Sequence, residues 1–260
     1  MIKRKHLSTG VLTVIGILIL LFMYIPIIVV VLYAFNADSV NYFPMRGASF
    51  KWFAKMAADD DLIRSLEHSL VIAGISTGVA CVLGVTGGYG MYRFDFPGKS
   101  FMNKLVMLPL ILPGILTGVA LLTFYQAVGI HQGMMAVILG HSTFLIATVL
   151  PQVYSRLQQL DGNIIEAAED LGATSSQTFF HVVLPNIQTA IISSALLSFT
   201  LSMDEIPVTY FLNGIFSTLP IQIWGMTRNG ITPEVNAISS LIFIISLAAI
   251  LISNMLSKEE

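Results

Sequence analysis

The sequence predicts an all-α, polytopic membrane protein with six transmembrane helices. Of its 260 residues, 55% are hydrophobic and 11% are charged, which excludes an ordinary soluble globular domain. The mean hydropathy of +0.80 points the same way. A membrane-spanning helix needs about 20 apolar residues. Stretches of that length without Asp, Glu, Lys or Arg occur at 11–35, 69–92, 105–130, 133–155, 182–203 and 235–257. We expect residues 1–260 to form a single transmembrane domain.

The first stretch is predicted to be a retained helix, although it follows a basic cluster as a signal peptide would. The stretch 11–35 exceeds the ~7 to 15 residues of a signal-peptide core, and no clear small-residue cleavage site follows it. An even number of spans places both termini on one side of the membrane. Cytoplasmic termini put eight basic residues inside (Lys3, Arg4, Lys5, Arg93, Lys99, Lys104, Arg156 and Lys258) and five outside (Arg46, Lys51, Lys55, Arg64 and Arg228). This excess favours cytoplasmic termini.

The two longest outer segments are predicted to differ in character. In residues 36–68, aromatic residues around Trp52 alternate with lysines, which predicts a short amphipathic helix at the outer interface. Residues 206–235 are rich in proline and glycine and predict an irregular external segment.

The second and third predicted spans carry residues that affect helix packing. Glycines at four-residue spacing in the second span allow another helix to approach closely, and the same span holds the sole cysteine, Cys81, for which we expect a packing role. Pro109 and Pro113 remove amide donors from the third span and predict a bend. This bent span either lines a translocation path or is curved only for packing.

The loop between these spans ends in Gly98-Lys99-Ser100, which copies the end of a phosphate-binding loop. The first glycine of that motif would fall at position 93, which is arginine, and no buried strand precedes it. Nucleotide binding is therefore rejected, and a cytoplasmic turn is predicted.

Titratable side chains within the later spans are candidates for function. His141 is the only one in the fourth span, and either a hydrogen bond between helices or a role in transport would account for it. Asp204 and Glu205 interrupt an apolar stretch just before Pro207. Because neighbouring helical residues point about 100° apart, we expect one acid to face a water-filled path and the other to face elsewhere. Alternatively, the span ends near residue 203 and both acids are wetted at the outer interface.

The segment 161–185, between the fourth and fifth spans, predicts two short helices that meet at a bend. Asp161 is positioned to N-cap a helix that runs through Leu171, and Gly172 is suited to a left-handed turn after it. Thr174 and Gln177 have the spacing of a capping box. Pro185 fits the first turn of the next membrane helix.

This segment resembles the EAA loop of ABC importer permeases. The matching residues are Glu166, Ala167, Ala168, Gly172, Leu184 and Pro185, with Val182 where the family pattern usually has Ile. The resemblance implies a type I importer permease fold, in which the cytoplasmic loop 156–185 contains a coupling helix that docks on an ATPase subunit. It also implies these partners: a second permease subunit in a heterodimer, two ATP-binding subunits and an extracytoplasmic solute-binding protein. The location implied is the bacterial inner membrane.

The resemblance extends to the permease subunits of spermidine/putrescine importers, through residues 25–36, 218–224 and the SFTLSMDEI sequence. A polyamine path requires carboxylates for ammonium groups and aromatic faces for cation–π contacts. Asp204, Glu205, Tyr210 and Trp224 supply these groups. Some members of the family carry an acid in the third span, where this chain has Pro113 and Gly114, so another small solute is the alternative.

Two other functional classes compete with the importer permease. A passive channel would also tolerate kinked spans and acids, but it has no need of a docking loop. A membrane enzyme would require clustered catalytic or metal-binding groups, and none is evident around His141. The chain has no nucleotide-binding motif, so we expect no catalytic residues, cofactor or metal, and no binding of nucleic acid.

Overall fold

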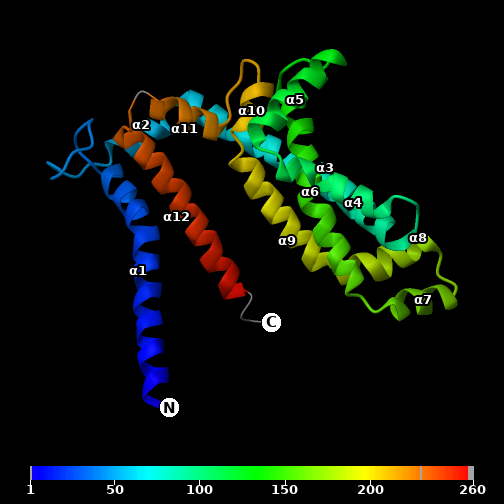
Figure 1. Ribbon diagram of the computed structural model, residues 1–260. Coiled ribbons are helices and arrows are strands. Elements are labelled where there is room, and N and C mark those ends of the chain that lie inside the picture. The colour runs from blue at the N-terminus through cyan, green and yellow to red at the C-terminus, as the bar shows by residue number, and fades with distance from the viewer. Residues whose placement is uncertain (1, 229, 257–260) are drawn as a thin grey trace. The chain divides into compact units, whose positions relative to one another are not determined.

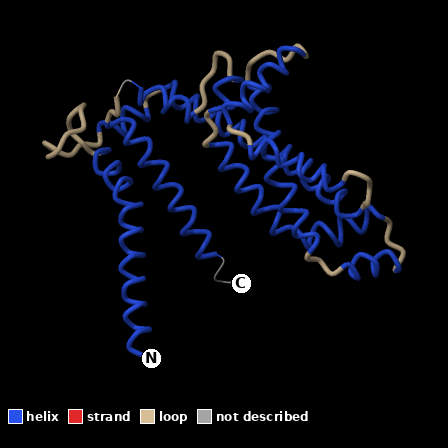
Figure 2. Tube along the Cα trace, in the orientation of Figure 1, coloured by secondary structure: helices blue, strands red, loops and turns tan. Residues whose placement is uncertain are grey.

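The computed structural model describes residues 2–228 and 230–256, and within them the secondary structure is helical apart from one isolated bridge between Asn36 and Ala48 (Figure 2). The helices are α1 (Ile2–Ala34), α2 (Lys51–Ala57), α3 (Asp60–Arg93), α4 (Lys99–Ile111), α5 (Gly114–Ala127), α6 (Met134–Gln158), α7 (Gly162–Asp170), α8 (Ser175–Gln177), the π-helical segment η1 (Thr178–Val183), α9 (Leu184–Met203), α10 (Pro207–Leu212), α11 (Leu219–Arg228) and α12 (Pro233–Leu256). The chain divides into two compact units: Met1–Ile63 with Ile223–Glu260, and Arg64–Gln222.

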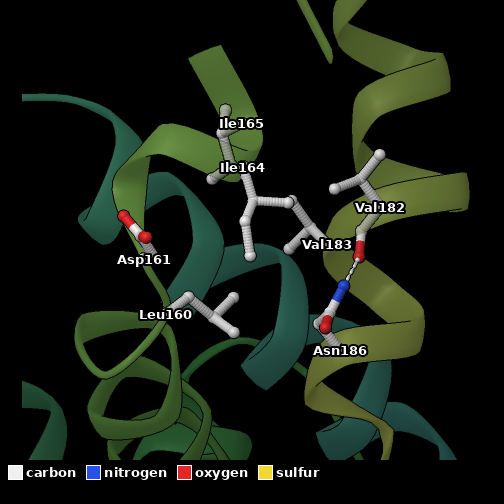
Figure 3. A pocket seen from close by; sticks show the side chains of 7 residues that line it. All are labelled: Leu160, Asp161, Ile164, Ile165, Val182, Val183 and Asn186. Atoms are coloured by element: carbon white, nitrogen blue, oxygen red, sulfur yellow. Dashed lines mark hydrogen bonds between the residues drawn. The ribbon is translucent and has the colours of Figure 1, made fainter. Parts of the chain in front are cut away.

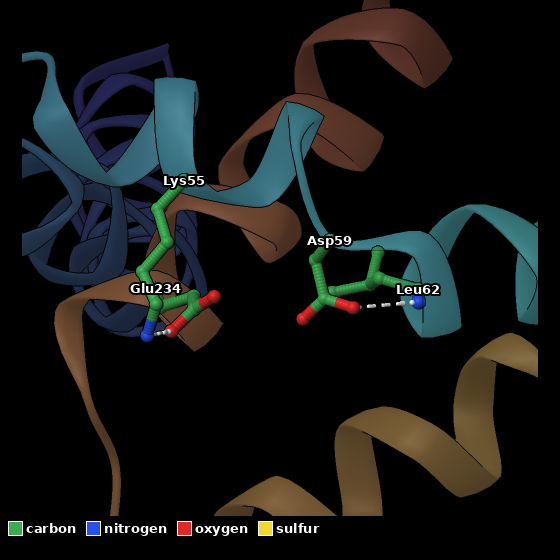
Figure 4. Close-up of polar contacts among 4 residues, drawn as sticks. All are labelled: Lys55, Asp59, Leu62 and Glu234. Atoms are coloured by element: carbon green, nitrogen blue, oxygen red, sulfur yellow. Dashed lines mark hydrogen bonds and ion pairs between the residues drawn. The ribbon is translucent and has the colours of Figure 1, made fainter.

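In the first unit, α1 lies beside α12, and α2 packs against α12 (Figure 1). Trp52 of α2 is buried, and its indole Nε1–H donates to the carbonyl of Asn36 at 2.7 Å. Lys55 forms an ion pair of 2.5 Å with the buried Glu234, and Asp59 accepts the amide hydrogen of Leu62 where α3 begins (Figure 4). The short outer helix predicted around Trp52 is therefore present as α2.

The second unit is organised around α6, which packs against α4, α9 and α10. One face of α9 carries small, buried side chains at four-residue spacing, namely Ser194, Ser198 and Ser202. Gly84, Gly87 and Gly88 of α3 permit close packing on α6. For example, a Cβ at Gly84 would lie 2.7 Å from the Cβ of Val149. In contrast, a Cβ at Gly74 or Gly78 would meet no described atom within 4 Å, so only part of the predicted glycine face is used.

The third predicted span is two helices, which corrects the expectation of one kinked helix over 105–130. α4 and α5 are bent by 105° at the break between them. Leu112 is extended, with φ −70° and ψ 141°, as the residue before a proline prefers. Pro113 then begins α5 as its N-cap, whereas Pro109 stays inside α4. Helices α4 and α5 therefore form one membrane span only if the span is a broken helix.

The other predicted spans fall within helices, although their bounds differ. By length and composition, four helical segments of the described chain could cross a membrane: Val11–Ala34, Asp60–Arg93, Met134–Gln158 and Ser175–Met203. The sixth predicted span lies in α12 up to Leu256, and its last residue, Ser257, is outside the described residues. The segment 206–235 is less irregular than expected, because α10 and α11 form within it. Pro207 and Pro220 occupy the first turns of these helices, where a missing amide hydrogen costs nothing.

Candidate functional site

The segment between α6 and α9 has the local structure that its sequence predicts. Asp161 N-caps α7, and its Oδ1 accepts the amide hydrogen of Asn163 at 3.1 Å. At the other end, Gly172 adopts φ +86°. Its amide donates to the Glu169 carbonyl at 2.9 Å, and the next amide, of Ala173, donates to Ala168 at 3.0 Å. This pair of bonds is a Schellman motif, which requires a left-handed residue at its centre.

The second helix of the segment begins with the predicted capping box. Thr174 Oγ1 accepts the amide hydrogen of Gln177, and Gln177 Oε1 accepts that of Thr174 at 2.8 Å. Pro185 lies in the first turn of α9, as predicted, although the helical backbone begins before α9. This backbone runs without interruption from Ser175 to Met203. Pro185 lies where η1 passes into α9, and its missing amide hydrogen suits this change of hydrogen-bond register.

One face of α7 packs on the protein and the other is exposed. Ile165 is 4% exposed and joins a core cluster with Val183 and Ile187, so it is not available to a partner. Figure 3 shows Ile164 and Ile165 beside Val182 and Val183 around a small hollow. Glu166 and Ala167 are exposed, Ala168 is half-buried, and the Leu171 side chain is 90% exposed.

A groove of about 430 Å³ continues this exposed face. It is lined by Leu171, Gly172, Ala173, Gln177, His181 and Val182. A second hollow, of about 360 Å³, lies against Leu184 and Pro185, of which Leu184 is half-buried and Pro185 is exposed. The residues singled out from the sequence are thus at least partly exposed, and we call them together the loop surface.

An ion pair ties this segment to α3. Arg93 Nη2, at the end of α3, lies 2.8 Å from Glu169 Oε1 and 2.9 Å from Oε2. Nearby, the rings of Tyr89 and Phe179 are 4.8 Å apart. The sequence predicted a cytoplasmic position for Arg93 but no partner for it. The two partners are 76 positions apart, and nothing in the local sequence indicates their pairing.

The acids Asp204 and Glu205 lie where α9 ends and α10 begins, a place that we call the acid corner. Asp204 is the C-cap of α9 and is exposed. Glu205 is half-buried, and its Oε1 accepts the amide hydrogen of Val208 at 2.9 Å, in the first turn of α10. The two acids therefore have different surroundings, and α9 ends at Met203, where the alternative placed the end of the span.

Glu205 lines a cavity of about 200 Å³ beside the α4–α5 break. A Cβ at Gly114 would lie 3.7 Å from Glu205 Oε1. The other lining residues are Pro109, Leu110, Leu112, Thr117, Phe144, Leu201 and Val208. The hydroxyl of Thr117 is buried and has no hydrogen-bond partner among the described residues. The cavity thus combines an acid, a hydroxyl and an aromatic ring in an otherwise apolar lining.

The two predicted aromatic residues belong to different units. Tyr210 is half exposed on α10, with its ring 5.7 Å from that of Phe211. Trp224 belongs to the other unit, where the Arg228 guanidinium lies 4.8 Å above its ring. Tyr210 therefore shares a unit with Glu205.

In the described residues, no group of three or more His, Cys, Asp or Glu could hold a metal ion.

Residues 80–258 match the family of binding-protein-dependent transport system inner membrane components, a stretch that includes both the loop surface and the acid corner. The chain belongs to this family. It is therefore a multi-pass permease subunit of an inner-membrane importer rather than an enzyme. The family match agrees with the permease fold that the EAA-like residues indicated.

Curated relatives cover nearly the whole chain. The spermidine/putrescine transport system permease protein PotC of Haemophilus influenzae is 33% identical over 92% of this chain and 93% of its own length. The putrescine transport system permease protein PotI of Escherichia coli (strain K12) is 36% identical over 85% of this chain and 81% of its own.

The fold is also found among solved structures. A chain from a bacterial ABC transporter involved in the import of the acidic polysaccharide alginate has a TM-score of 0.76 at 13% identity. The match covers 98% of this chain and 97% of that one. At this identity, the similarity concerns the fold alone.

Proposed function

We propose that this chain is one of two different permease subunits in an ATP-driven importer, and that the solute is a polyamine such as spermidine or putrescine. The observation that carries the proposal is the position of Glu205, which lines a cavity at the junction of two interrupted helices. Broken helices near membrane depth are tolerated where they line a cavity or are covered by protein. An acid in such a place defaults to a functional role.

The chemistry of this cavity suits a cation with a methylene chain. The Glu205 carboxylate can pair with an ammonium group, and Phe144 offers an aromatic face. The curated relatives named for spermidine and putrescine support the same solute class. Tyr210 and Trp224 are proposed as further contacts along the path, and Asp204 as an acid that attracts the cation before it reaches Glu205.

Transport requires ATPase partners, because the chain itself lacks a nucleotide-binding motif. The one resemblance to such a motif fails on structural grounds too, since the helix α3, and not a strand, precedes Gly98-Lys99-Ser100. We assign ATPase docking to the loop surface around Glu166, Ala167, Ala168, Gly172, Leu184 and Pro185. Exposed Leu171 supplies apolar contact there, and the small alanines allow another backbone to come close.

In this proposal, closure of two ATP-bound subunits pulls α7, and the Arg93–Glu169 ion pair conveys the pull to α3. The loop surface lies in the cytoplasm, with both termini on that side. A solute-binding protein delivers the polyamine outside. The whole chain, 1–260, acts as one transmembrane domain, with 156–185 as its coupling loop. The solute is moved without chemical change.

The test is ATP-dependent solute uptake by the reconstituted complex of both permeases, the ATPase subunits and the binding protein in proteoliposomes. Spermidine and putrescine should accumulate only with ATP inside the compartment that holds the ATPase. An anionic alginate oligosaccharide serves as the control solute and should not accumulate. ATPase stimulation by the binding protein without any polyamine uptake would retain the importer and overturn the solute.

A further inference from the structure

His141 lies where α6 meets α9 and α10, and its side chain is 1% exposed. The imidazole Nδ1 is 2.7 Å from the Oγ of Ser202, the penultimate residue of α9. On the other side, Nε2 is 2.8 Å from Thr209 Oγ1 in α10. The ring thus bridges the two helices on either side of the corner that carries Asp204 and Glu205.

The hydrogen bond that the Thr209 hydroxyl donates determines which ring nitrogen of His141 donates and which accepts. The Thr209 hydroxyl donates to the Glu205 backbone carbonyl at 3.0 Å, so its oxygen is left to accept. Nε2–H therefore donates to Thr209, and Nδ1 accepts from the Ser202 hydroxyl. A neutral imidazole satisfies all these groups, and the bonds form one chain from Ser202 through His141 and Thr209 to Glu205.

Close packing holds α10 against its neighbours at the same place. A Cβ at Gly140, the residue before His141, would lie 2.6 Å from Leu212 Cδ1. On the other side, a Cβ at Gly118 of α5 would lie 3.1 Å from the carbonyl oxygen of Pro207. Packing thus restricts movement of α10, while the His141 chain sets the backbone position of Glu205 itself.

We propose that His141 is a positioning residue for transport, acting through Thr209 to hold the Glu205 carboxylate in the cavity beside the α4–α5 break. This inference rests on the proposed function, in which Glu205 contacts the cationic solute. His141 lies behind the corner and is not among the residues that line the cavity. Its effect on the solute is therefore indirect. A second indirect effect is through Phe144, which lines the cavity and whose ring is 5.5 Å from the imidazole.

A role in helix packing alone makes a different prediction from a positioning role. Loss of packing would lower the amount of assembled complex and would reduce ATP hydrolysis and uptake together. Loss of positioning would lower the amount of solute moved per ATP. It would leave the half-saturating concentration of loaded binding protein unchanged, because that protein docks on the outer surface.

The experiment compares Thr209→Val with Thr209→Ser in the reconstituted complex. Valine has the shape of threonine but ends the hydrogen-bond chain, whereas serine retains the hydroxyl. We expect spermidine moved per ATP to fall about tenfold in Thr209→Val and to change by less than about twofold in Thr209→Ser. His141→Gln, whose amide offers a donor NH2 group and an acceptor oxygen, should likewise retain transport, and His141→Leu should lose it.

Measuring Thr209→Val in a Glu205→Gln background shows whether the hydrogen-bond chain acts through the Glu205 carboxylate or through another group. If the chain acts through the carboxylate, adding Thr209→Val to Glu205→Gln should cause no further loss of spermidine per ATP. Equal transport by Thr209→Val and Thr209→Ser, or fully multiplicative losses in the double variant, would overturn the positioning role. A wild-type complex that moves no polyamine would instead overturn the proposed function, so the two failures are distinguishable.

Discussion

The loop surface and the acid corner are built by opposite means. In the loop, the stabilising contacts are local: Asp161 caps the helix that follows it, and Gly172 closes the Schellman motif between residues one turn apart. At the corner, Glu205 depends on α5, α6 and α10, and the hydrogen bonds of His141 span more than 60 positions. A docking surface must be presented to a partner, whereas a solute site must be enclosed by several helices.

This contrast predicts which changes act through coupling and which act through the path. The largest effect is expected from Gly172→Pro. Proline cannot adopt φ +86° and lacks the amide hydrogen that bonds the Glu169 carbonyl. The bend should be lost, and both uptake and binding-protein-stimulated ATP hydrolysis should fall to background, about 100-fold or more, in proteoliposome assays.

Gly162→Ala is the matched control for this loop variant. Gly162 does not have a positive φ, and a Cβ there meets no described atom within 4 Å. Its uptake should equal that of the wild type. Membrane insertion of Gly172→Pro, checked by protease protection, should also be normal. Normal uptake by Gly172→Pro would remove the bend from the coupling role.

The next effect is expected at the corner, from Glu205→Gln. Removing the charge that faces the cavity should reduce spermidine uptake about 30-fold, as a lost charge-assisted contact of ~2 kcal/mol would. Asp204→Asn is the matched variant, and because Asp204 is exposed its uptake should fall only about threefold. Initial rates of labelled spermidine uptake measure both. The reverse order would place Asp204 rather than Glu205 in the path.

A smaller effect, on stability, should distinguish the packed glycines from the open ones. Gly140→Val would force a side chain into Leu212, at a cost of about 1–3 kcal/mol. Gly78→Ala has open space and should be neutral or slightly stabilising. Thermal unfolding of the detergent-solubilised complex measures both variants. Equal melting temperatures would show that α6 and α10 are not in close contact.

The smallest effect is expected from the Arg93–Glu169 ion pair. Its side chains are 41% and 31% exposed, so water screens their attraction, and the pair should contribute no more than about 1 kcal/mol. Arg93→Ala and Glu169→Ala should each lower the ATP-coupled uptake rate about twofold, and the double variant should lose no more than either. Additive losses in this cycle would show that the two residues act separately.

The sequence-based predictions follow the same division. The caps at Asp161 and Thr174, the turn at Gly172 and the helical character of the spans could be predicted because each depends on residues within a few positions. The 105° break at Pro113 was underestimated, because a proline shows where a helix weakens but not how far it bends. Burial of Ile165, the Arg93–Glu169 pair and the His141 bridge arise from contacts between distant elements, which local patterns do not specify.

The central claim is that the exposed loop drives transport while the enclosed corner carries the solute. Simultaneous measurement of spermidine uptake and ATP hydrolysis in proteoliposomes tests it most directly, with Glu166→Ala compared against Glu205→Gln. The account predicts that Glu166→Ala lowers both rates together, and that Glu205→Gln lowers uptake while binding-protein-stimulated ATP hydrolysis continues. A proportional loss of both rates in Glu205→Gln, or unaltered rates in Glu166→Ala, would contradict it.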